Sequence, residues 1–260
     1  VEAPEERTAT VQPPQTHPQR SVQSRKVWLL AAAAVVIAVM AIGTLRQFST
    51  EYATSVGTHR LVQLDDGTTV HLNTNSRIAV SFARSTRTVE LLHGEALFDI
   101  GSDKRPFRVI SGDLKIEDIG TRFSVRAEPD TLAVAVLDGR IRLQPRRGRP
   151  WPHAPEFTGG DAITVVTESE PFVITRTPTP VEQLERQLSW TEGKLVFDDV
   201  PLERAIAEFN RYNVRQLEIV DPQIAGLRIG GQFATTDPEE FALALRSLRI
   251  RVLPPVPGEK

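Results

Sequence analysis

Between residues 52 and 176, short apolar or alternating segments follow one another, which is the pattern of β-strands. We find no helical period of useful length in this region. The pattern predicts an all-β sandwich, barrel or β roll. The expected strands are 61–64, 68–72, 77–82, 87–92, 95–100, 107–110, 114–119, 122–127, 132–137 and 140–143.

Turn sequences separate these strands at intervals of about 8–12 residues. Two of them, Asp66-Gly67 and Asp138-Gly139, predict two-residue hairpin turns. The others are His93-Gly94, with His93 at a strand edge, and the segments 111–113 and 128–130. Residues 145–160 are rich in Pro, Gly and Arg and predict a loop. Its cluster of Arg146, Arg147 and Arg149 is either an anion-binding patch or, as we favour, part of a solvated loop.

From residue 190 the period changes, and the order of elements becomes β-α-β-β-α-β. Strands are expected at 194–199, 216–221, 227–234 and 250–253, with helices at 201–213 and 238–248. Pro201 begins the first helix, and Asp237 is the expected N-cap of the second. This module of about 65 residues is small, and we expect Trp190, Phe197, Phe209 and Tyr212 to form its core.

Residues 27–45 contain no charge, while Lys26 and Arg46 close the run at either end. A helix of this length spans roughly 28 Å, about the hydrocarbon thickness of a bilayer. We therefore predict a single transmembrane helix. A buried core helix is less favoured, because such helices seldom lack a polar face. A cleaved signal peptide is also less favoured, because its apolar region is usually shorter.

These patterns divide the chain into five parts. They are a Pro-rich cytoplasmic linker (1–26), the membrane helix (27–45), the all-β domain (46–177), a second linker (178–189) and the α+β module (190–260).

The charges near the predicted span favour a cytoplasmic N-terminus, because positive residues stay inside. Four basic residues precede the span and two follow it, namely Arg7, Arg20, Arg25 and Lys26 against Arg46 and Arg60. The larger C-terminal part is then expected in the periplasm of a bacterial inner-membrane protein. The formal net charge of −2 gives no field that would attract nucleic acid.

The sequence carries no recognisable catalytic or metal site. It has no cysteine, its five histidines are scattered, and it has no nucleophile elbow or phosphate-binding glycine loop. The acidic pairs lie at expected turns and helix starts, where carboxylates have capping roles; they are Asp65/Asp66, Asp198/Asp199 and Glu239/Glu240. We therefore expect no enzymatic activity and no cofactor.

Several motifs resemble the FecR family of single-pass sigma-factor regulators. Residues 64–82 (LDDGTTVHLNTNSRIAVSF) resemble the family's L-x-D-G-S/T-x-V-x-L-N-x-x-S run, and 87–109 contain its G-E-A-x-F and R-P-F-x-V runs. Residues 116–125 and 133–143 resemble a third block, with Ile119 and Asp138 in place of the usual Leu and Glu. The end of the chain resembles the family's C-terminal module, which is similar to the short N-terminal domain of secretins and TonB-dependent receptors.

The resemblance implies a signalling function. The periplasmic part would bind the signalling domain of a TonB-dependent outer-membrane receptor of iron–siderophore complexes. The signal would cross the bilayer through 27–45, with regulated proteolysis by an intramembrane protease, and change the activity of an extracytoplasmic-function sigma factor. The family's cytoplasmic sigma-binding domain is expected to be missing here, because residues 1–26 are too short to form it.

The strand at 227–234 is the preferred contact for the receptor, because two glycines let another backbone approach. The candidate residues are Arg228, Ile229, Gly230, Gly231, Gln232 and Phe233. The glycines also fit an internal bulge, which is the interpretation we favour. Two other classes of protein remain as alternatives. One is a periplasmic scaffold that binds cell-wall components, although the low content of Trp and Tyr argues against it. The other is an envelope enzyme, although the sequence has no recognisable catalytic site.

Overall fold

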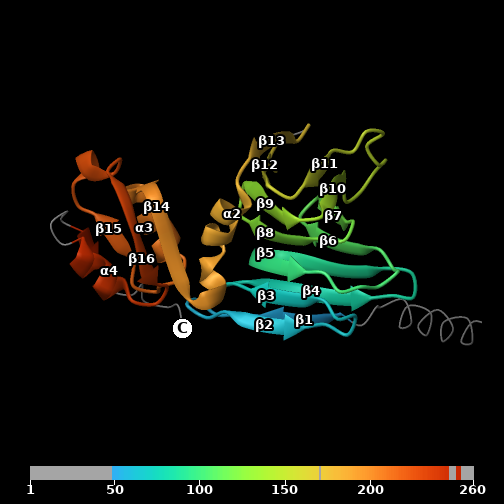
Figure 1. Ribbon diagram of the computed structural model, residues 1–260, viewed down its shortest axis with the longest axis horizontal. Coiled ribbons are helices and arrows are strands. Elements are labelled where there is room, and N and C mark those ends of the chain that lie inside the picture. Colours follow the sequence, from blue (N-terminus) through green and yellow to red (C-terminus); the bar gives the residue numbers. More distant parts are fainter. Residues whose placement is uncertain (1–48, 170, 246–249, 253–260) are drawn as a thin grey trace, which may run out of the picture. The chain divides into compact units, whose positions relative to one another are not determined.

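The computed structural model describes residues 49–169, 171–245 and 250–252 (Figure 1). The predicted linker 1–26 and membrane helix 27–45 lie outside the described residues. None of the helices in the described ranges is long and apolar enough to cross a membrane.

Among the described residues, thirteen strands form the β-domain, which confirms the prediction of a mainly β chain (Figure 1). They join in one continuous sheet that curls over on itself, so the fold is closer to a β roll than to a sandwich of separate sheets. The strands are β1 (Thr50–Ala53), β2 (Arg60–Gln63), β3 (Thr69–Leu72), β4 (Arg77–Phe82), β5 (Arg87–Asp99), β6 (Phe107–Ser111), β7 (Leu114–Asp118), β8 (Arg122–Ala127), β9 (Thr131–Asp138), β10 (Arg140–Pro145), β11 (Glu156–Thr158), β12 (Asp161–Val166) and β13 (Val173–Pro178).

Strand β5 belongs to both halves of the sheet. Its first half pairs with β4 and β6, and its second half pairs with β3 and β8. Buried side chains from both halves, such as Val89 and Phe98, then pack into one core. The turn predicted at His93-Gly94 is therefore wrong. The register shifts there, with His93 opposite Arg77 and Leu91 opposite Ile78, so the site is a bulge within one strand.

The hairpin predicted at Asp138-Gly139 is also wrong. Strand β9 pairs with β8 and β12, whereas β10 pairs with β7 and β11, so the two strands do not pair with each other. Gly139 turns the chain from one half of the sheet to the other. By contrast, Asp66-Gly67 does lie between the paired strands β2 and β3, but the loop is longer than the predicted two residues, because the N–H of Leu64 donates to the carbonyl of Thr68 and residues 65–67 form the turn. The turns at 111–113 and 128–130 likewise join paired strands.

A buried ion pair stabilises one end of the β-domain core. Arg87 Nη1 lies 2.6 Å from Asp66 Oδ2, and both side chains are almost completely buried. The guanidinium also donates to the carbonyl oxygens of Gly101 and Arg105 and lies over the ring of Phe107. Asp66 in turn accepts from the backbone N–H and hydroxyl of Thr68. Each charge is thereby compensated.

The C-terminal part has the predicted order β-α-β-β-α-β. Its strands form two small sheets, β14 with β16 and β15 with β17. These elements are β14 (Lys194–Pro201), α3 (Leu202–Asn210), β15 (Leu217–Ile219), β16 (Arg228–Ala234), α4 (Pro238–Ala244) and β17 (Ile250–Val252), with a 3-10 turn η2 (Pro222–Ile224) before β16. Asp237 caps α4, as expected, by accepting from the backbone N–H of Glu240 at 2.8 Å.

The segment 178–189, which we expected to be a linker, contains helix α2 (Val181–Gln187). The 3-10 helix η1 (Ser189–Glu192) follows directly. Leu184, Leu188 and Trp190 from this segment are buried. Helix α2 has only seven residues and buries one of them, Leu184. So short a segment shows no clear helical period, and the prolines beside it predict a linker instead.

The core of the C-terminal module contains all four aromatic residues expected there. Trp190, Phe197, Phe209 and Tyr212 are buried in one cluster. Phe209 and Phe241 stack at 4.6 Å between ring centroids, and Phe233 meets Phe241 edge-on. These contacts bring α3, α4, β14 and β16 together around one apolar centre.

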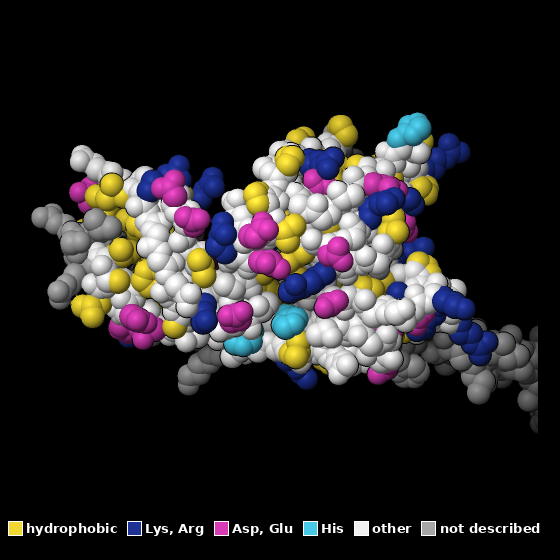
Figure 2. Space-filling model, viewed as in Figure 1, with side chains coloured by type: hydrophobic (Ala, Val, Ile, Leu, Met, Phe, Trp, Pro, Cys, Tyr) yellow, Lys and Arg dark blue, Asp and Glu magenta, His cyan; other side chains and the backbone are white. Residues whose placement is uncertain are grey.

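Acidic and basic side chains alternate over the face shown in Figure 2, without a large patch of one sign. Many are paired, for example Arg142 with Glu156 across two strands, and Arg146, just after β10, with Glu90 of β5. Arg146 is therefore engaged, while Arg147 and Arg149 are exposed, as a solvated loop requires. This distribution agrees with the small net charge.

We predict that Asp66→Asn lowers the free energy of unfolding by about 3 kcal/mol, because it leaves the Arg87 guanidinium buried without its countercharge. Urea unfolding of a fragment covering 46–260 at pH 7 would measure this. Asp65→Asn is the matched control: the neighbouring carboxylate is exposed, and its loss should change stability by less than about 0.5 kcal/mol. Equal effects of the two substitutions would contradict the role given to the buried pair.

Candidate functional site

The C-terminal module packs on the outer side of the curled sheet. Leu97 of β5 and Leu137 of β9 point away from the β-domain core and belong instead to the apolar cluster of the module. Helix α2 contacts both β9 and β14 and so borders the two parts. The place where they meet therefore combines an apolar contact with the charged groups around it, and it is the candidate functional site.

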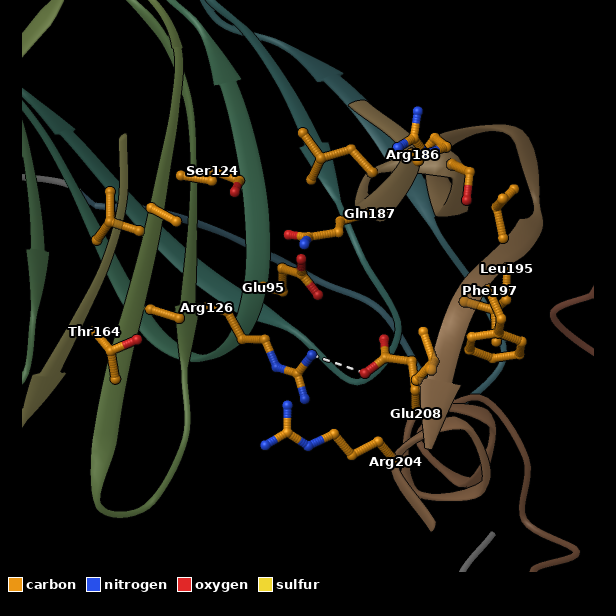
Figure 3. Close-up of a pocket in the computed structure, with 18 of the residues that line it drawn as sticks. Glu95, Ser124, Arg126, Thr164, Arg186, Gln187, Leu195, Phe197, Arg204 and Glu208 are labelled. Atoms are coloured by element: carbon orange, nitrogen blue, oxygen red, sulfur yellow. Dashed lines mark hydrogen bonds and ion pairs between the residues drawn. The ribbon is translucent and has the colours of Figure 1, made fainter. Parts of the chain in front are cut away.

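A cavity of about 350 Å³ lies within this meeting place (Figure 3). Strands β8, β9 and β12 line one side, and α2, β14 and α3 line the other. Ligand sites in proteins have volumes of about 300–1,000 Å³ and are frequent between domains. The cavity therefore has the size and position of a binding site.

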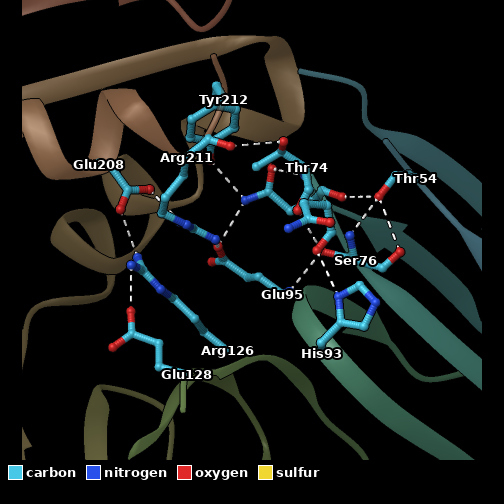
Figure 4. Close-up of polar contacts among 12 residues, drawn as sticks. Thr54, Thr74, Ser76, His93, Glu95, Arg126, Glu128, Glu208, Arg211 and Tyr212 are labelled. Carbon is cyan, nitrogen blue, oxygen red and sulfur yellow. Dashed lines mark hydrogen bonds and ion pairs between the residues drawn. The ribbon is translucent and has the colours of Figure 1, made fainter. Parts of the chain in front are cut away.

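A network of six polar residues lies beside the cavity and joins the two parts (Figure 4). We call it the interdomain network; its members are Asn73, Glu95, Arg126, Glu208, Arg211 and Tyr212. The amide of Asn73 donates to Glu95 Oε2 and to the hydroxyl of Tyr212, at 2.8 Å each. Tyr212 is thus a core residue of the module whose hydroxyl is held by the β-domain.

The charged members of the interdomain network alternate in sign. Arg211 donates to Glu95 at 2.7 Å and to Glu208 at 2.5 Å. Glu208 also accepts from Arg126 at 2.8 Å, and Arg126 lies 2.6 Å from Glu128. Two contacts therefore cross between the β-domain and helix α3 or its end. This half-buried row of alternating charges fixes the orientation of the C-terminal module on the β-domain, because a shift of either part would separate charged groups from their partners.

The position of Glu95 depends on a close approach between the backbone at Gly94 and the turn before β4. Gly94 has a φ of +85°, and a Cβ atom there would lie 2.2 Å from the hydroxyl oxygen of Ser76. That hydroxyl accepts from the backbone N–H of Glu95 and donates to the carbonyl of Thr74. The Thr74 hydroxyl donates to the carbonyl of Arg211 at 3.2 Å. The bulge in β5 and the turn before β4 therefore set the position of Glu95.

The electrostatic environment favours the charged forms of Glu208 and Arg211. Burial alone would raise the pKa of Glu208, but the charges of Arg211 and Arg126 outweigh it and lower that pKa below its ordinary value. Burial opposes the charge of Arg211, yet Glu95 and Glu208 raise its pKa. Burial and the two carboxylates raise the pKa of Tyr212, so its hydroxyl stays neutral and can hydrogen bond.

The predicted contact residues lie in β16, which pairs with β14. Ile229 is buried, Phe233 is half-buried among aromatic rings, and Gly230, Gly231 and Gln232 are exposed. Arg228 lies 3.7 Å from Asp199. The register shifts between Phe197 and Val200 of β14, opposite Gly230. The β14–β16 pair therefore has a register irregularity next to the glycines, and β16 also has an exposed stretch. The role of β16 in binding stays a prediction.

Sequence reasoning did not identify the interdomain network. The family motifs include Asn73 and Glu95 without giving either a partner, and the sequence pattern predicts a turn at His93-Gly94. A signal was present, because Glu95 directly precedes the apolar run Ala96–Phe98. A carboxylate within such a strand requires a buried partner. Among the described residues, no group of three or more His, Cys, Asp or Glu could hold a metal ion.

Comparison with known proteins identifies part of the chain. Residues 50–142 match the family model described as FecR protein. The chain carries a FecR domain. This confirms the resemblance drawn from the motifs within those residues, including the Asn73 and Glu95 runs. Among curated proteins, none matches the chain.

Two crystal structures resemble this fold. Both are described as a "putative anti-sigma factor" from Parabacteroides distasonis ATCC 8503. One has 22% sequence identity and a TM-score of 0.59, and the match covers 80% of this chain and all of the other. The second has 24% identity and a TM-score of 0.58, with coverage of 76% and 91%. At these identities the likeness shows the fold alone.

We predict that Glu208→Gln destabilises the protein near pH 7 but much less in acid. The folded state lowers the pKa of Glu208, so its carboxylate contributes stability above the unfolded pKa of about 4.3 and loses that contribution as the pH falls below it. Urea unfolding of wild type and variant at pH 7 and 3.5 would show the gap in free energy shrinking. Glu203→Gln, an exposed carboxylate on the same helix, is the control and should show little gap at pH 7. A gap for Glu208→Gln that is equal at both pH values would mean that its charge contributes nothing.

Proposed function

We propose that this protein is a membrane-anchored regulator of an extracytoplasmic-function sigma factor. The observation that carries the proposal is the FecR domain at residues 50–142. The two similar folds, each described as a "putative anti-sigma factor", support the same class of function. Their matches extend over most of this chain, including residues beyond the FecR domain.

In this proposal, residues 27–45 form the membrane span and the described part lies in the periplasm. The support is the uncharged run itself and the excess of basic residues before it. The periplasmic part receives a signal, which passes through the span to a sigma factor bound on the cytoplasmic side.

The signal is proposed to come from the periplasmic signalling domain of a TonB-dependent siderophore receptor. The C-terminal module has features that suit docking of a small domain. Its β14–β16 sheet has only two strands among the described residues, so each strand has an edge without a strand partner there. Exposed strand edges accept an added strand through main-chain hydrogen bonds.

Calorimetry provides a direct test. The folded fragment 46–260 would be titrated with the isolated signalling domains of the TonB-dependent receptors encoded in the same genome. We expect one domain to bind with a Kd in the micromolar range or tighter. If the fragment is folded and none of the domains binds, the receptor-sensing proposal is wrong.

We further predict that Gly230→Val weakens this binding at least tenfold while leaving the fold intact. A Cβ atom at Gly230 would lie 3.6 Å from the nearest atom, an ordinary contact, so the side chain fits but keeps another backbone away from the exposed stretch of β16. Gly226→Val is the control, because a Cβ there meets nothing within 4 Å and lies before the strand. Unchanged binding by Gly230→Val would remove β16 as the contact.

A further inference from the structure

The cavity beside the interdomain network opens onto the edge of β14 that β16 does not use. Among its lining residues are the consecutive residues Leu195, Val196 and Phe197, together with Val200, but no residue of β16. No residue of β16 lines the cavity, so the cavity lies on the side of β14 away from that partner strand. In the described part of the chain, β14 pairs with β16 alone.

Small side chains form the opposite wall of the cavity. Ala133 and Ala135 of β9 and Ala162 of β12 line it, and all three are half-buried. Alanines on the outer face of the sheet leave room for the side chains of a segment lying between that face and β14. The combination of an apolar wall and a strand edge with backbone hydrogen-bonding groups is suited to an extended peptide.

The charged residues of the cavity indicate which peptide fits. Three arginines line it, Arg126, Arg186 and Arg204, against two carboxylates, Glu95 and Glu208. Both carboxylates are already paired with arginines in the interdomain network. Arg186 makes only a long, exposed contact with Asp198 at 3.5 Å.

Arg204 differs from the other two arginines, because its guanidinium has no ion pair or hydrogen bond to any described residue. Figure 3 shows its side chain extending from α3 into the cavity, with its guanidinium pointing toward that of Arg126. Two like charges that point toward each other at a cavity favour an anion between them, and a carboxylate can accept two hydrogen bonds from a guanidinium.

We infer that this cavity binds an extended, acidic peptide segment of a partner protein, which adds along the free edge of β14 and places a carboxylate at Arg204. The edge supplies the main-chain hydrogen bonds, the alanine wall accepts apolar side chains, and Arg204 selects for negative charge. The site is separate from the proposed contact strand β16, and the inference does not depend on which protein supplies the segment.

A random heptapeptide library displayed on phage tests this inference with the 260-residue chain in detergent micelles. We expect the selected peptides to be rich in Asp or Glu next to β-branched residues and to lack proline. A selected peptide, synthesised and labelled, should bind in fluorescence anisotropy at least tenfold more weakly to Arg204→Glu. The same variant should recover binding when the acidic residue of the peptide is replaced by Lys, because the charge pair is then restored in reverse.

Two controls separate the cavity from general effects of charge. Arg147→Glu removes an exposed, unpaired arginine outside the cavity and should leave peptide binding unchanged. Ala135→Phe should abolish binding by filling the cavity, with unfolding measurements showing that the variant is folded. Selection of basic or no peptides, or equal binding of an acidic peptide to wild type, Arg204→Glu and Ala135→Phe, would overturn the inference.

Discussion

The fold depends on the lack of room beside Gly94. Ser76 and the backbone of Asn75 approach so closely that no side chain fits there, and the strand adopts a positive φ. Because of this bulge, β5 continues from one half of the sheet into the other instead of ending in a turn. The residues after the bulge then divide between two cores: Phe98 faces the β-domain and Leu97 faces the C-terminal module.

Buried charges serve two different purposes in this chain. The Arg87–Asp66 pair lies inside one domain, where carbonyl oxygens and a hydroxyl complete its hydrogen bonding. The interdomain network instead joins two parts that each have an apolar core. Taking such charges out of water is costly, so their net contribution to stability is small, but a misplaced module would leave several of them unpaired. The main effect of the network is therefore to restrict the module to one orientation, and it adds little to the strength of the contact between the module and the β-domain.

The sequence was sufficient for the features that depend on local pattern. Strand alternation predicted most strands of the β-domain, and the change of period at 190 predicted the order of the module and the cap at Asp237. It failed where a strand changes partners, at Gly94 and Gly139, since a glycine at a corner of a curled sheet has the same local signature as a glycine in a turn. It also missed Arg211 and Glu208, because their partners Glu95 and Arg126 are more than 80 residues away in the chain.

Three residues belong to both the interdomain network and the wall of the cavity, namely Glu95, Arg126 and Glu208. Arg126 of β8 pairs with Glu208 of α3, and Arg204 belongs to the same helix. An anion held between Arg204 and Arg126 would therefore contact both parts of the chain. By thermodynamic linkage, whatever changes the docking of the module would then change the affinity for the anion to the same extent. Occupation of the cavity and docking of the module are in this way coupled through the guanidinium of Arg126, which gives the protein a physical means of responding to what it binds.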